Sequence, residues 1–417
     1  MISGALPGDV VTTHPTMKIK RNLIFADLKD ILSPSPDRLE HPCPHYAEHC
    51  PSSPLGALKY EAALAWKCRH LSETMRRIGK QASQKISSPI AADPQWGYRN
   101  RLELHCFTQS GAIRLGYRNG SELIPIENCL LAEGKIQDAL RTLYRAMVSQ
   151  KGYGKDVLEA CARPDHLPRL LLHDNGRGAA VCILFLRHPT ADAVGGFQNL
   201  LRSADLAGWR ILGVRDLKIR HHSFRMLAEE GDVSVAFPVL GGENLIGSPL
   251  IFSQVNAAAA QKMIARVLEL PPEGGALLDL YGGYGAFALA YASSKRGRAR
   301  VVESSDEAVS VGKAYAKRQR LPVDYQLQDL RGSMQRNSDW KKWDAALVDP
   351  PRSGLHDPLI RQLNHSGPCR LIYVSCHPAA LARDLTRLQA YLVSELIPVD
   401  LFPQTSDLET VAVLDRF

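Results

Sequence analysis

Leu277-Leu278-Asp279-Leu280-Tyr281-Gly282-Gly283-Tyr284-Gly285 reads as an apolar strand that runs directly into a glycine-rich turn. From Gly247 onward, apolar runs of strand length alternate with segments of helical periodicity. We expect strands at 276–280, 299–303, 323–327, 345–348, 370–374, 396–401 and 411–414, and helices at 256–268 and up to 316. This alternation predicts an α/β fold whose C-terminal part is an open, mostly parallel, doubly wound sheet.

The glycine-rich turn predicts a cofactor site. In doubly wound sheets ligands bind beyond the carboxyl ends of the strands, and an acid at the end of the next strand, here Glu303, commonly takes the ribose hydroxyls of a nucleoside. The glycines at 282, 283 and 285 do not follow the Gly-x-Gly-x-x-Gly spacing of dinucleotide-binding proteins. A nucleoside cofactor without a pyrophosphate, such as S-adenosylmethionine, therefore fits the pattern better.

Asp349-Pro350-Pro351-Arg352 follows another of the expected strands. Consecutive prolines stiffen the loop and remove backbone donors, so the carboxylate that precedes them is held toward the ligand. Related loops with Asn followed by Pro-Pro-Tyr accompany methylation of amino nitrogens. Asp at this position argues against that target.

A third strand delivers one cysteine into a turn, in Ile372-Tyr373-Val374-Ser375-Cys376-His377-Pro378. Packing is the usual role of such a cysteine, but Cys376 stands at the strand end where ligands bind. A thiolate there can add to carbon 6 of uracil and make carbon 5 nucleophilic enough to take a methyl group. A base must then remove the proton from carbon 5. Glu409 is our candidate base and Asp407 competes with it, because sequence spacing does not separate them.

Composition sets broad limits on the class of protein. A chain of 417 residues is long enough for two or three domains, and its formal net charge of +8 fits a polyanionic partner such as nucleic acid. No apolar run is long enough to cross a bilayer and the start lacks signal-peptide order, so we expect a cytoplasmic protein. The nine cysteines are scattered and odd in number, which makes a disulfide framework improbable.

The first 40 residues show little periodicity, and Ser33-Pro34-Ser35-Pro36 marks a linker. Cys43 and Cys50 follow in a proline-punctuated loop that also contains two histidines. This pattern fits either a metal or cluster site that takes further ligands from elsewhere, or two free thiols. From Tyr60 to Ile78 apolar residues recur at helical spacing, with Cys68 in the core-facing stripe.

The middle of the chain predicts a mixed α+β unit. One hairpin is expected from runs 101–107 and 113–117, another from runs 170–173 and 179–186 around Asp174-Asn175-Gly176, and a helix across 136–147, with Cys106 and Cys182 in the core. Tyr98-Arg99-Asn100-Arg101 begins this unit and a second basic cluster spans 218–225. Basic residues beside aromatics suit contacts to single-stranded RNA, and a solvated strand face is the alternative.

Five blocks occur in a characteristic order: Phe252-Ser253-Gln254-Val255-Asn256, the turn 278–285, Asp349-Pro350-Pro351-Arg352, Ser375-Cys376-His377-Pro378 and Phe402-Pro403-Gln404-Thr405. Together they resemble the RNA 5-methyluridine (uracil-C5) methyltransferase family, in particular its 23S ribosomal RNA type. The resemblance implies a Rossmann-like class I methyltransferase domain in which S-adenosylmethionine contacts Gln254, Tyr281, Glu303, Asp329 and Asp349. It also implies that Cys376 is the nucleophile and Glu409 the base.

The resemblance also implies an organisation for the rest of the chain. Residues 1–40 look like part of an oligonucleotide-binding segment, 41–82 form a cysteine-containing loop and helix, 83–246 an RNA-binding middle domain and 247–417 the methyltransferase domain. Arg99 and Arg101, in the Tyr-Arg-x-Arg motif, are expected to grip RNA while the target uridine is turned out of its stack.

The sequence departs from the family pattern at several positions. The family's iron–sulfur site uses four cysteines, of which Cys43, Cys50 and Cys129 match three while Ser53 stands at the remaining position. Serine ligates iron only weakly beside thiolate, so a [4Fe-4S] cluster and its absence both stay open. Ala286 and His377 each replace an asparagine that is usual in the family. At the front, the run 7–11 looks like the later half of an oligonucleotide-binding barrel whose first strands are missing.

Our leading hypothesis is an enzyme that methylates carbon 5 of a uridine in RNA, with 23S ribosomal RNA as substrate and a monomer as the working unit. A transfer RNA methyltransferase is the second hypothesis. The third is a paralogue that binds RNA without catalysis, which the shortened front, Ser53 and Ala286 suggest.

Overall fold

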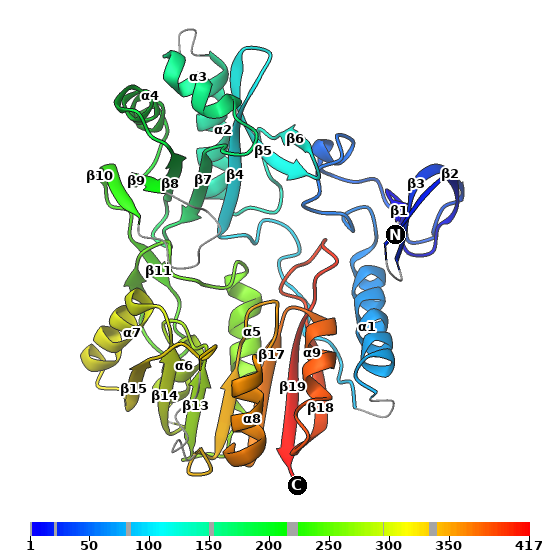
Figure 1. Ribbon diagram of the computed structural model, residues 1–417, viewed down its shortest axis with the longest axis vertical. Coiled ribbons are helices and arrows are strands. Elements are labelled where there is room, and N and C mark those ends of the chain that lie inside the picture. The colour runs from blue at the N-terminus through cyan, green and yellow to red at the C-terminus, as the bar shows by residue number, and fades with distance from the viewer. Residues whose placement is uncertain are drawn as a thin grey trace.

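The computed structural model describes residues 2–20, 23–80, 85–149, 154–214, 224–294, 296–332 and 340–417 of the chain. Its strands form a three-stranded sheet near the N-terminus, a seven-stranded middle sheet, a two-stranded ribbon and a seven-stranded C-terminal sheet. The two large sheets lie one above the other in Figure 1, with the N-terminal sheet beside them. Residues 218–223 of the second basic cluster lie outside the described ranges.

The C-terminal sheet has the strand order β15-β14-β13-β16-β17-β19-β18. Its strands are β13 (Ala276–Leu280), β14 (Arg298–Glu303), β15 (Val323–Leu327), β16 (Ala345–Val348), β17 (Arg370–Ser375), β18 (Tyr391–Val399) and β19 (Glu409–Arg416). The first five in chain order pair in parallel, whereas β19 runs antiparallel to both of its neighbours. The predicted doubly wound sheet is therefore confirmed.

Helices cover both faces of this sheet. One face packs against α5 (Ala257–Leu268), α6 (Ala286–Ser293) and α7 (Asp306–Arg318), and the other against α8 (Asp357–Ser366), α9 (Pro378–Leu385) and α1 (Tyr60–Arg77). Successive residues of one strand serve the two layers, since Leu277 belongs to the first core and Leu278 to the second. Burial on both faces explains why the strands read as near-continuous apolar runs. Figure 1 shows α1 beside α9, although more than three hundred residues separate them in sequence.

The middle sheet has the order β10-β9-β8-β7-β4-β5-β6. It consists of β4 (Arg101–Gln109), β5 (Ala112–Asn119), β6 (Glu122–Pro125), β7 (Arg169–Asp174), β8 (Ala180–Arg187), β9 (Gly208–Val214) and β10 (Arg225–Gly231). Helices α2 (Gly134–Ser149), α3 (Lys155–Ala162) and α4 (Ala191–Arg202) pack on one of its faces. Both predicted hairpins and the helix at 136–147 are confirmed. The pattern missed α3, which is short, and α4, whose two glycines lower helical propensity.

The N-terminal sheet contains β1 (Ile2–Ser3), β2 (Val10–Lys20) and β3 (Leu23–Ser33), in the order β1-β3-β2. The sequence predicted only an extended run at 7–11. Three register shifts interrupt the pairing of β2 with β3, so neither strand keeps the simple alternation that marks a strand in sequence. The two-stranded ribbon of β11 (Val235–Phe237) and β12 (Leu245–Gly247) leads into the C-terminal sheet.

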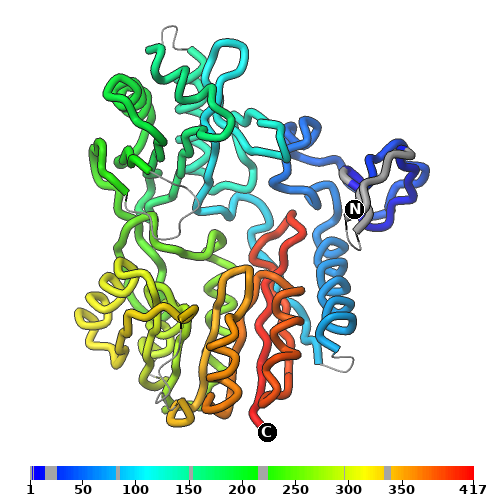
Figure 2. Tube along the Cα trace, in the orientation of Figure 1, coloured from blue at the N-terminus to red at the C-terminus, as the bar shows by residue number. Residues whose placement is uncertain are grey.

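The loop 400–408, which leads into β19, joins the different parts of the chain. The backbone N–H of Leu55 donates to the Gln404 carbonyl at 2.9 Å, and the Tyr98 hydroxyl donates to the Pro403 carbonyl at 3.1 Å. Figure 2 shows this red segment reaching up between the blue and cyan segments of the chain. The loop is thus held by residues that precede it by more than three hundred positions in the sequence.

All nine cysteines are free thiols. Cys106 and Cys182 are fully buried, as predicted, whereas Cys68 is only partly buried. Among the helices of the described ranges, none combines the length and apolar character needed to cross a membrane.

Candidate active site

The residues singled out by sequence gather at one edge of the C-terminal sheet. Asp349 directly follows β16 and Cys376 directly follows β17, so both lie at the carboxyl ends of parallel strands. Because β19 runs the opposite way, its first residue, Glu409, lies at the same edge. Ser375 pairs with Thr410 in the β17–β19 ladder, which places Cys376 and Glu409 at the next opposing positions. The antiparallel strand therefore brings a carboxylate to the cysteine.

Two opposing effects act on the pKa of the half-buried Cys376 thiol. Burial raises the pKa of this thiol, the nearby Glu409 raises it further, and the guanidinium of Arg352 within hydrogen-bonding reach opposes both effects. Arg352 also forms an ion pair with Asp407, with 2.8 Å between Nη2 and Oδ2. Sequence reasoning quoted Arg352 only as part of a motif and did not assign it to the thiol.

Glu409 is 1 % exposed, and its Oε1 atom has no hydrogen-bond partner. Burial raises the pKa of Glu409 well above its usual value, and the neighbouring carboxylates Asp349 and Asp407 raise it further. A carboxylate with a raised pKa is a better proton acceptor once ionised. Its competitor Asp407 is engaged by Arg352 instead, so the two acids that the sequence could not separate differ in their surroundings.

A cavity of about 320 Å³ opens beside this edge, between the two large sheets. Gln254, Tyr281 and Asp349 line it together with Gly282 and Gly283 of the glycine-rich turn. The volume lies in the range of small-molecule sites. Three of the five residues expected to contact the cofactor are thus brought together around one cavity.

The other two expected cofactor residues lie at the same sheet edge but are not among the residues that line the cavity. Glu303 ends β14, and its Oε2 atom accepts a hydrogen bond from the Gly283 N–H at 3.1 Å. Asp329 follows β15 as an exposed carboxylate paired with Arg331 at 2.7 Å. Asp329 is close enough to Tyr281 to contribute to the raised pKa of its phenol, about 12, whose main cause is burial.

The glycine-rich turn has the backbone that a close ligand contact requires. Gly283 has a φ of 58°, and a Cβ placed there would meet nothing within 4 Å, so this residue faces open space. The start of α6 is fixed by Asp279, whose Oδ2 atom accepts the Ala288 N–H at 3.2 Å. Burial raises the pKa of the Asp279 carboxyl to about 8, and its Oδ1 atom has no partner.

The cavity lining fits a nucleoside cation such as S-adenosylmethionine. Ser253 Oγ and the Tyr281 hydroxyl are buried and lack hydrogen-bond partners, so polar atoms are free for a ligand. Burial raises the pKa of Asp349 to about 7, which means that a bound cation would favour its ionised form. S-adenosylmethionine carries a sulfonium charge that suits such a carboxylate.

The middle sheet supplies part of the cavity wall, which sequence reasoning missed. Asn100, Glu133, His173 and Asp174 line it from that side. Burial and the neighbouring Asp174 raise the pKa of Glu133 to about 7. His173 Nδ1 lies 2.6 Å from the Asp174 carbonyl oxygen and must donate to it, so the buried Nε2 atom is left as an acceptor. The sequence marked Asn100 as part of the basic motif and Asp174 as part of a hairpin turn, but it marked none of the four as part of a cavity.

The two arginines of the basic motif point to different neighbours. Arg99 is half-buried and its Nη2 atom donates to the Ser52 carbonyl at 3.4 Å, while Arg101 lies on β4 in register with His173. Their contact with RNA stays a prediction.

Comparison with known proteins places the chain in a family. A family model described as tRNA (Uracil-5-)-methyltransferase matches residues 332–417. The 23S rRNA (uracil(1939)-C(5))-methyltransferase RlmD of Xanthomonas oryzae pv. oryzae is 30 % identical over 437 residues, which span 100 % of this chain and 91 % of the relative. The chain belongs to the RNA (uracil-C5)-methyltransferase family. The enzyme of the same name from Stenotrophomonas maltophilia is 29 % identical over 442 residues, again covering 100 % and 91 % of the two chains.

The fold of a solved family member is also similar. The crystal structure of Pyrococcus abyssi tRNA (uracil-54, C5)-methyltransferase, in complex with S-adenosyl-L-homocysteine, superposes with a TM-score of 0.72 and 21 % identity. The superposition covers 99 % of this chain and 95 % of the solved one. The similarity therefore extends over the whole architecture, beyond the C-terminal sheet.

The residues that match the family's iron–sulfur site do not fit a [4Fe-4S] cluster in this structure. Cys43, Cys50, Cys129 and Ser53 are buried around a cavity of about 10 Å³, which is room for about one water molecule. Ser53 Oγ is already within 3.3 Å of His41 Nε2. Among the described residues, no group of three or more His, Cys, Asp or Glu side chains is placed to hold a metal ion.

Proposed function

We propose that this protein transfers a methyl group from S-adenosylmethionine to carbon 5 of a uridine in 23S ribosomal RNA. The observation that carries the proposal is the grouping of Cys376, Arg352 and Glu409 at the sheet edge that borders the cavity. Relatives that align with the entire chain are named as 23S rRNA uracil-C5 methyltransferases. The roles given below to individual residues are part of the proposal.

The cofactor is proposed to lie in the cavity, with its methionine end near Gln254 and Asp349 and its ribose at Glu303. S-adenosylmethionine supplies an electrophilic methyl group there. Tyr281 closes the pocket beside the glycine-rich turn, and Asp329 completes the polar rim at the end of β15. The ionised Asp349 carboxylate balances the positive charge of the cofactor.

Cys376 is proposed to be the nucleophile. Its thiolate adds to carbon 6 of the uracil ring, which forms a carbon–sulfur bond and moves the electron pair of the 5,6 double bond toward carbon 5 and the carbonyl at carbon 4. Arg352 favours the thiolate, because a cation next to a thiol stabilises its charged form. Carbon 5 then takes the methyl group, whose bond to sulfur breaks to leave S-adenosylhomocysteine, and carbon 5 still carries its own hydrogen.

Glu409 is proposed to remove that hydrogen as a proton. The electron pair of the carbon–hydrogen bond re-forms the double bond, and the carbon–sulfur bond breaks to release the Cys376 thiolate. Oε1 of Glu409 is the free atom available for this proton. Burial keeps water away from the carboxylate, which increases its basicity at the moment of transfer.

The middle region, 83–246, is proposed to bind the RNA, with Arg99 and Arg101 among its contacts, and residues 247–417 to carry the reaction. The net charge of +8 supports a polyanionic partner. Three smaller parts of the proposal follow from the substrate and the sequence. They are a cytoplasmic location where ribosomal RNA is made, a monomeric working unit, and a division of the front of the chain into residues 1–40 and a cysteine-containing loop and helix at 41–82.

Mass spectrometry of nucleosides tests the proposal. 5-Methyluridine should be lost from one 23S position when the gene is deleted, and restored by the wild-type gene but not by Cys376→Ala. Loss from transfer RNA instead would favour the transfer RNA hypothesis. Purified Cys376→Ala should also fail to form a covalent complex with RNA that contains 5-fluorouridine. Full methylation by this variant would refute the mechanism.

A further inference from the structure

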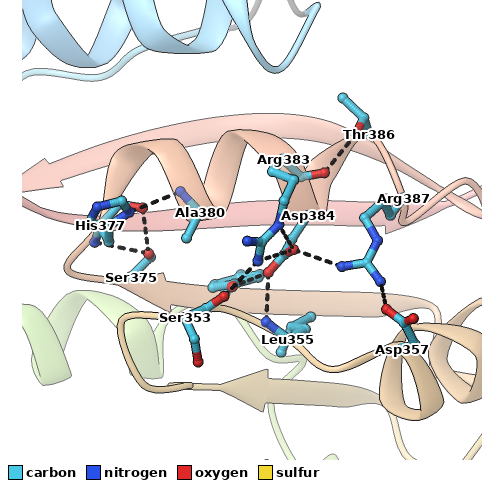
Figure 3. Close-up of polar contacts among 11 residues, drawn as sticks. Ser353, Leu355, Asp357, Ser375, His377, Ala380, Arg383, Asp384, Thr386 and Arg387 are labelled. Atoms are coloured by element: carbon cyan, nitrogen blue, oxygen red, sulfur yellow. Dashed lines mark hydrogen bonds and ion pairs between the residues drawn. The ribbon is translucent and has the colours of Figure 1, made fainter. Parts of the chain in front are cut away.

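A fully buried carboxylate, Asp384, lies in α9 just beyond the turn that carries Cys376. Its Oδ2 atom accepts hydrogen bonds from the Leu355 N–H at 2.6 Å and the Tyr373 hydroxyl at 2.9 Å. Its Oδ1 atom accepts from Arg383 at 2.8 Å and from Arg387 at 3.2 Å (Figure 3). A buried charge is retained only when it is paired and hydrogen-bonded, and here both oxygen atoms are satisfied.

The partners of Asp384 belong to the segments that carry the reacting groups. Leu355 lies in the loop that begins with Asp349-Pro350-Pro351-Arg352, and Tyr373 lies on β17 three positions before Cys376. Arg383 also donates to the Ser353 carbonyl at 2.6 Å, directly after Arg352. One carboxylate therefore ties the loop 349–356, here called the arginine loop, to the strand and the helix on either side of the nucleophile. Figure 3 shows its contact with Leu355 of that loop.

The arginine loop can approach Asp384 only because residue 354 is glycine. Gly354 has a φ of 80°, which side chains rarely adopt, and a Cβ there would collide with Asp384 Oδ2 and with the Arg383 guanidinium. The Arg352 side chain, two residues earlier, is 62 % exposed and pairs with Asp407 on its solvent side. The close contact at Gly354 is thus a direct mechanical link between the loop and α9.

We propose that Asp384 is a positioning residue that fixes the Arg352 guanidinium against the Cys376 thiol by holding the arginine loop to α9 and β17. This inference rests on the proposed role of Cys376 as nucleophile. The ordinary alternative is that Asp384 only stabilises helix packing. The two differ in their consequence for the thiol, because only the positioning role makes thiolate formation depend on Asp384.

The test measures the reactivity of Cys376 without RNA. Iodoacetamide alkylation of the Cys376 peptide is followed by mass spectrometry across pH in the full-length chain, so the other cysteines do not interfere. In Asp384→Asn the profile should shift to higher pH, because the loop carries Arg352 away from the thiol. The rate of covalent complex formation with 5-fluorouridine RNA should fall about ten- to a hundredfold, since a misplacement near 1 Å has that effect. Affinity for S-adenosylmethionine should stay unchanged.

Asp357→Asn is the matched control, because it removes the exposed partner of Arg387 at the far side of the same cluster. It should leave the alkylation profile and the complex rate at wild-type values. Tyr373→Phe removes a single bond to Asp384 and should give a smaller shift in the same direction, even if Asp384→Asn fails to fold.

Two results would overturn the inference: a wild-type alkylation profile in folded Asp384→Asn or in Tyr373→Phe, or an equal shift in Asp357→Asn. Failure of the proposed function looks different. In that case wild-type protein forms no covalent complex with 5-fluorouridine RNA, while the alkylation shift in Asp384→Asn still reports whether the loop positions Arg352.

Discussion

Replacing Lys67 by methionine should strongly destabilise the protein. Lys67 lies on α1, and its side chain is only 1 % exposed. Its Nζ atom donates to Asp400 Oδ1 at 2.8 Å and to the Phe402 carbonyl at 2.9 Å. Burial lowers the pKa of this amine, and the neighbouring Asp400 carboxylate opposes that effect. The positive charge of Lys67 therefore depends on its pairing with Asp400.

The size of the effect follows from what the substitution leaves behind. Methionine fills much of the space of the lysine stem, but Asp400 remains a buried carboxylate without a counter-charge. Removing one partner of a buried pair typically costs about 3–5 kcal/mol of folding free energy. Because the pair also anchors the loop 400–408, we expect the loss of stability to be accompanied by slower methyl transfer.

Urea unfolding followed by tryptophan fluorescence measures the change in unfolding free energy. Lys59→Met is the matched control, since Lys59 pairs with Asp37 at 3.2 Å while both side chains are about half exposed. That exposed pair should contribute only about 0–1 kcal/mol. Adding Asp400→Asn to Lys67→Met should recover part of the loss by removing the stranded charge. Equal effects of Lys67→Met and Lys59→Met, or no recovery in the double variant, would refute the reasoning.

Three further outcomes are expected. Glu409→Gln should still add to uridine but release product about 10²- to 10⁴-fold more slowly, so a methylated covalent complex should accumulate on denaturing gels; turnover near the wild-type rate would contradict its role as base. Burial raises the pKa of Asp279 to about 8 and that of Asp349 to about 7, so above about pH 4 the folded protein keeps protons that the unfolded chain has released. The free energy of unfolding therefore falls as the pH rises, until both carboxyls have ionised in the folded protein at about pH 7 to 8. The urea midpoint should therefore fall from pH 6 to pH 8, and by less with saturating S-adenosylmethionine; a flat profile would argue against it. Anaerobically purified protein should contain far less than one iron atom per chain, because the cavity between Cys43, Cys50 and Cys129 is too small for a cluster. About four iron atoms per chain would contradict this prediction.

Much of the fold was predictable because burial imposes a period on the sequence. The strands of the C-terminal sheet are covered by helices on both faces, so they appear as apolar runs, and the helices between them show helical spacing. The hairpin at Asp174-Asn175-Gly176 was predictable from its turn residues alone. In β2 and β3 the register shifts interrupt the alternation of apolar and polar residues, so the sequence did not predict these two strands.

The site was predictable in its members but less so in its arrangement. Cys376, Asp349 and the glycine-rich turn each follow a strand, and parallel strands end at a common edge, so their convergence follows from chain order. The choice between Glu409 and Asp407 did not. It depends on the antiparallel register of β19 against β17, which no local pattern encodes.

The sequence by itself determined the α/β class, the family, and the set of side chains proposed for the reaction, because strand ends, glycine turns and chemical residue types are local properties. Only the tertiary structure decided how those side chains act on one another. Asp384 meets the arginine loop, and Lys67 meets Asp400 across 333 positions of sequence. Such pairings depend on how layers stack, and a buried charge gives no sign in the sequence of the partner that will neutralise it.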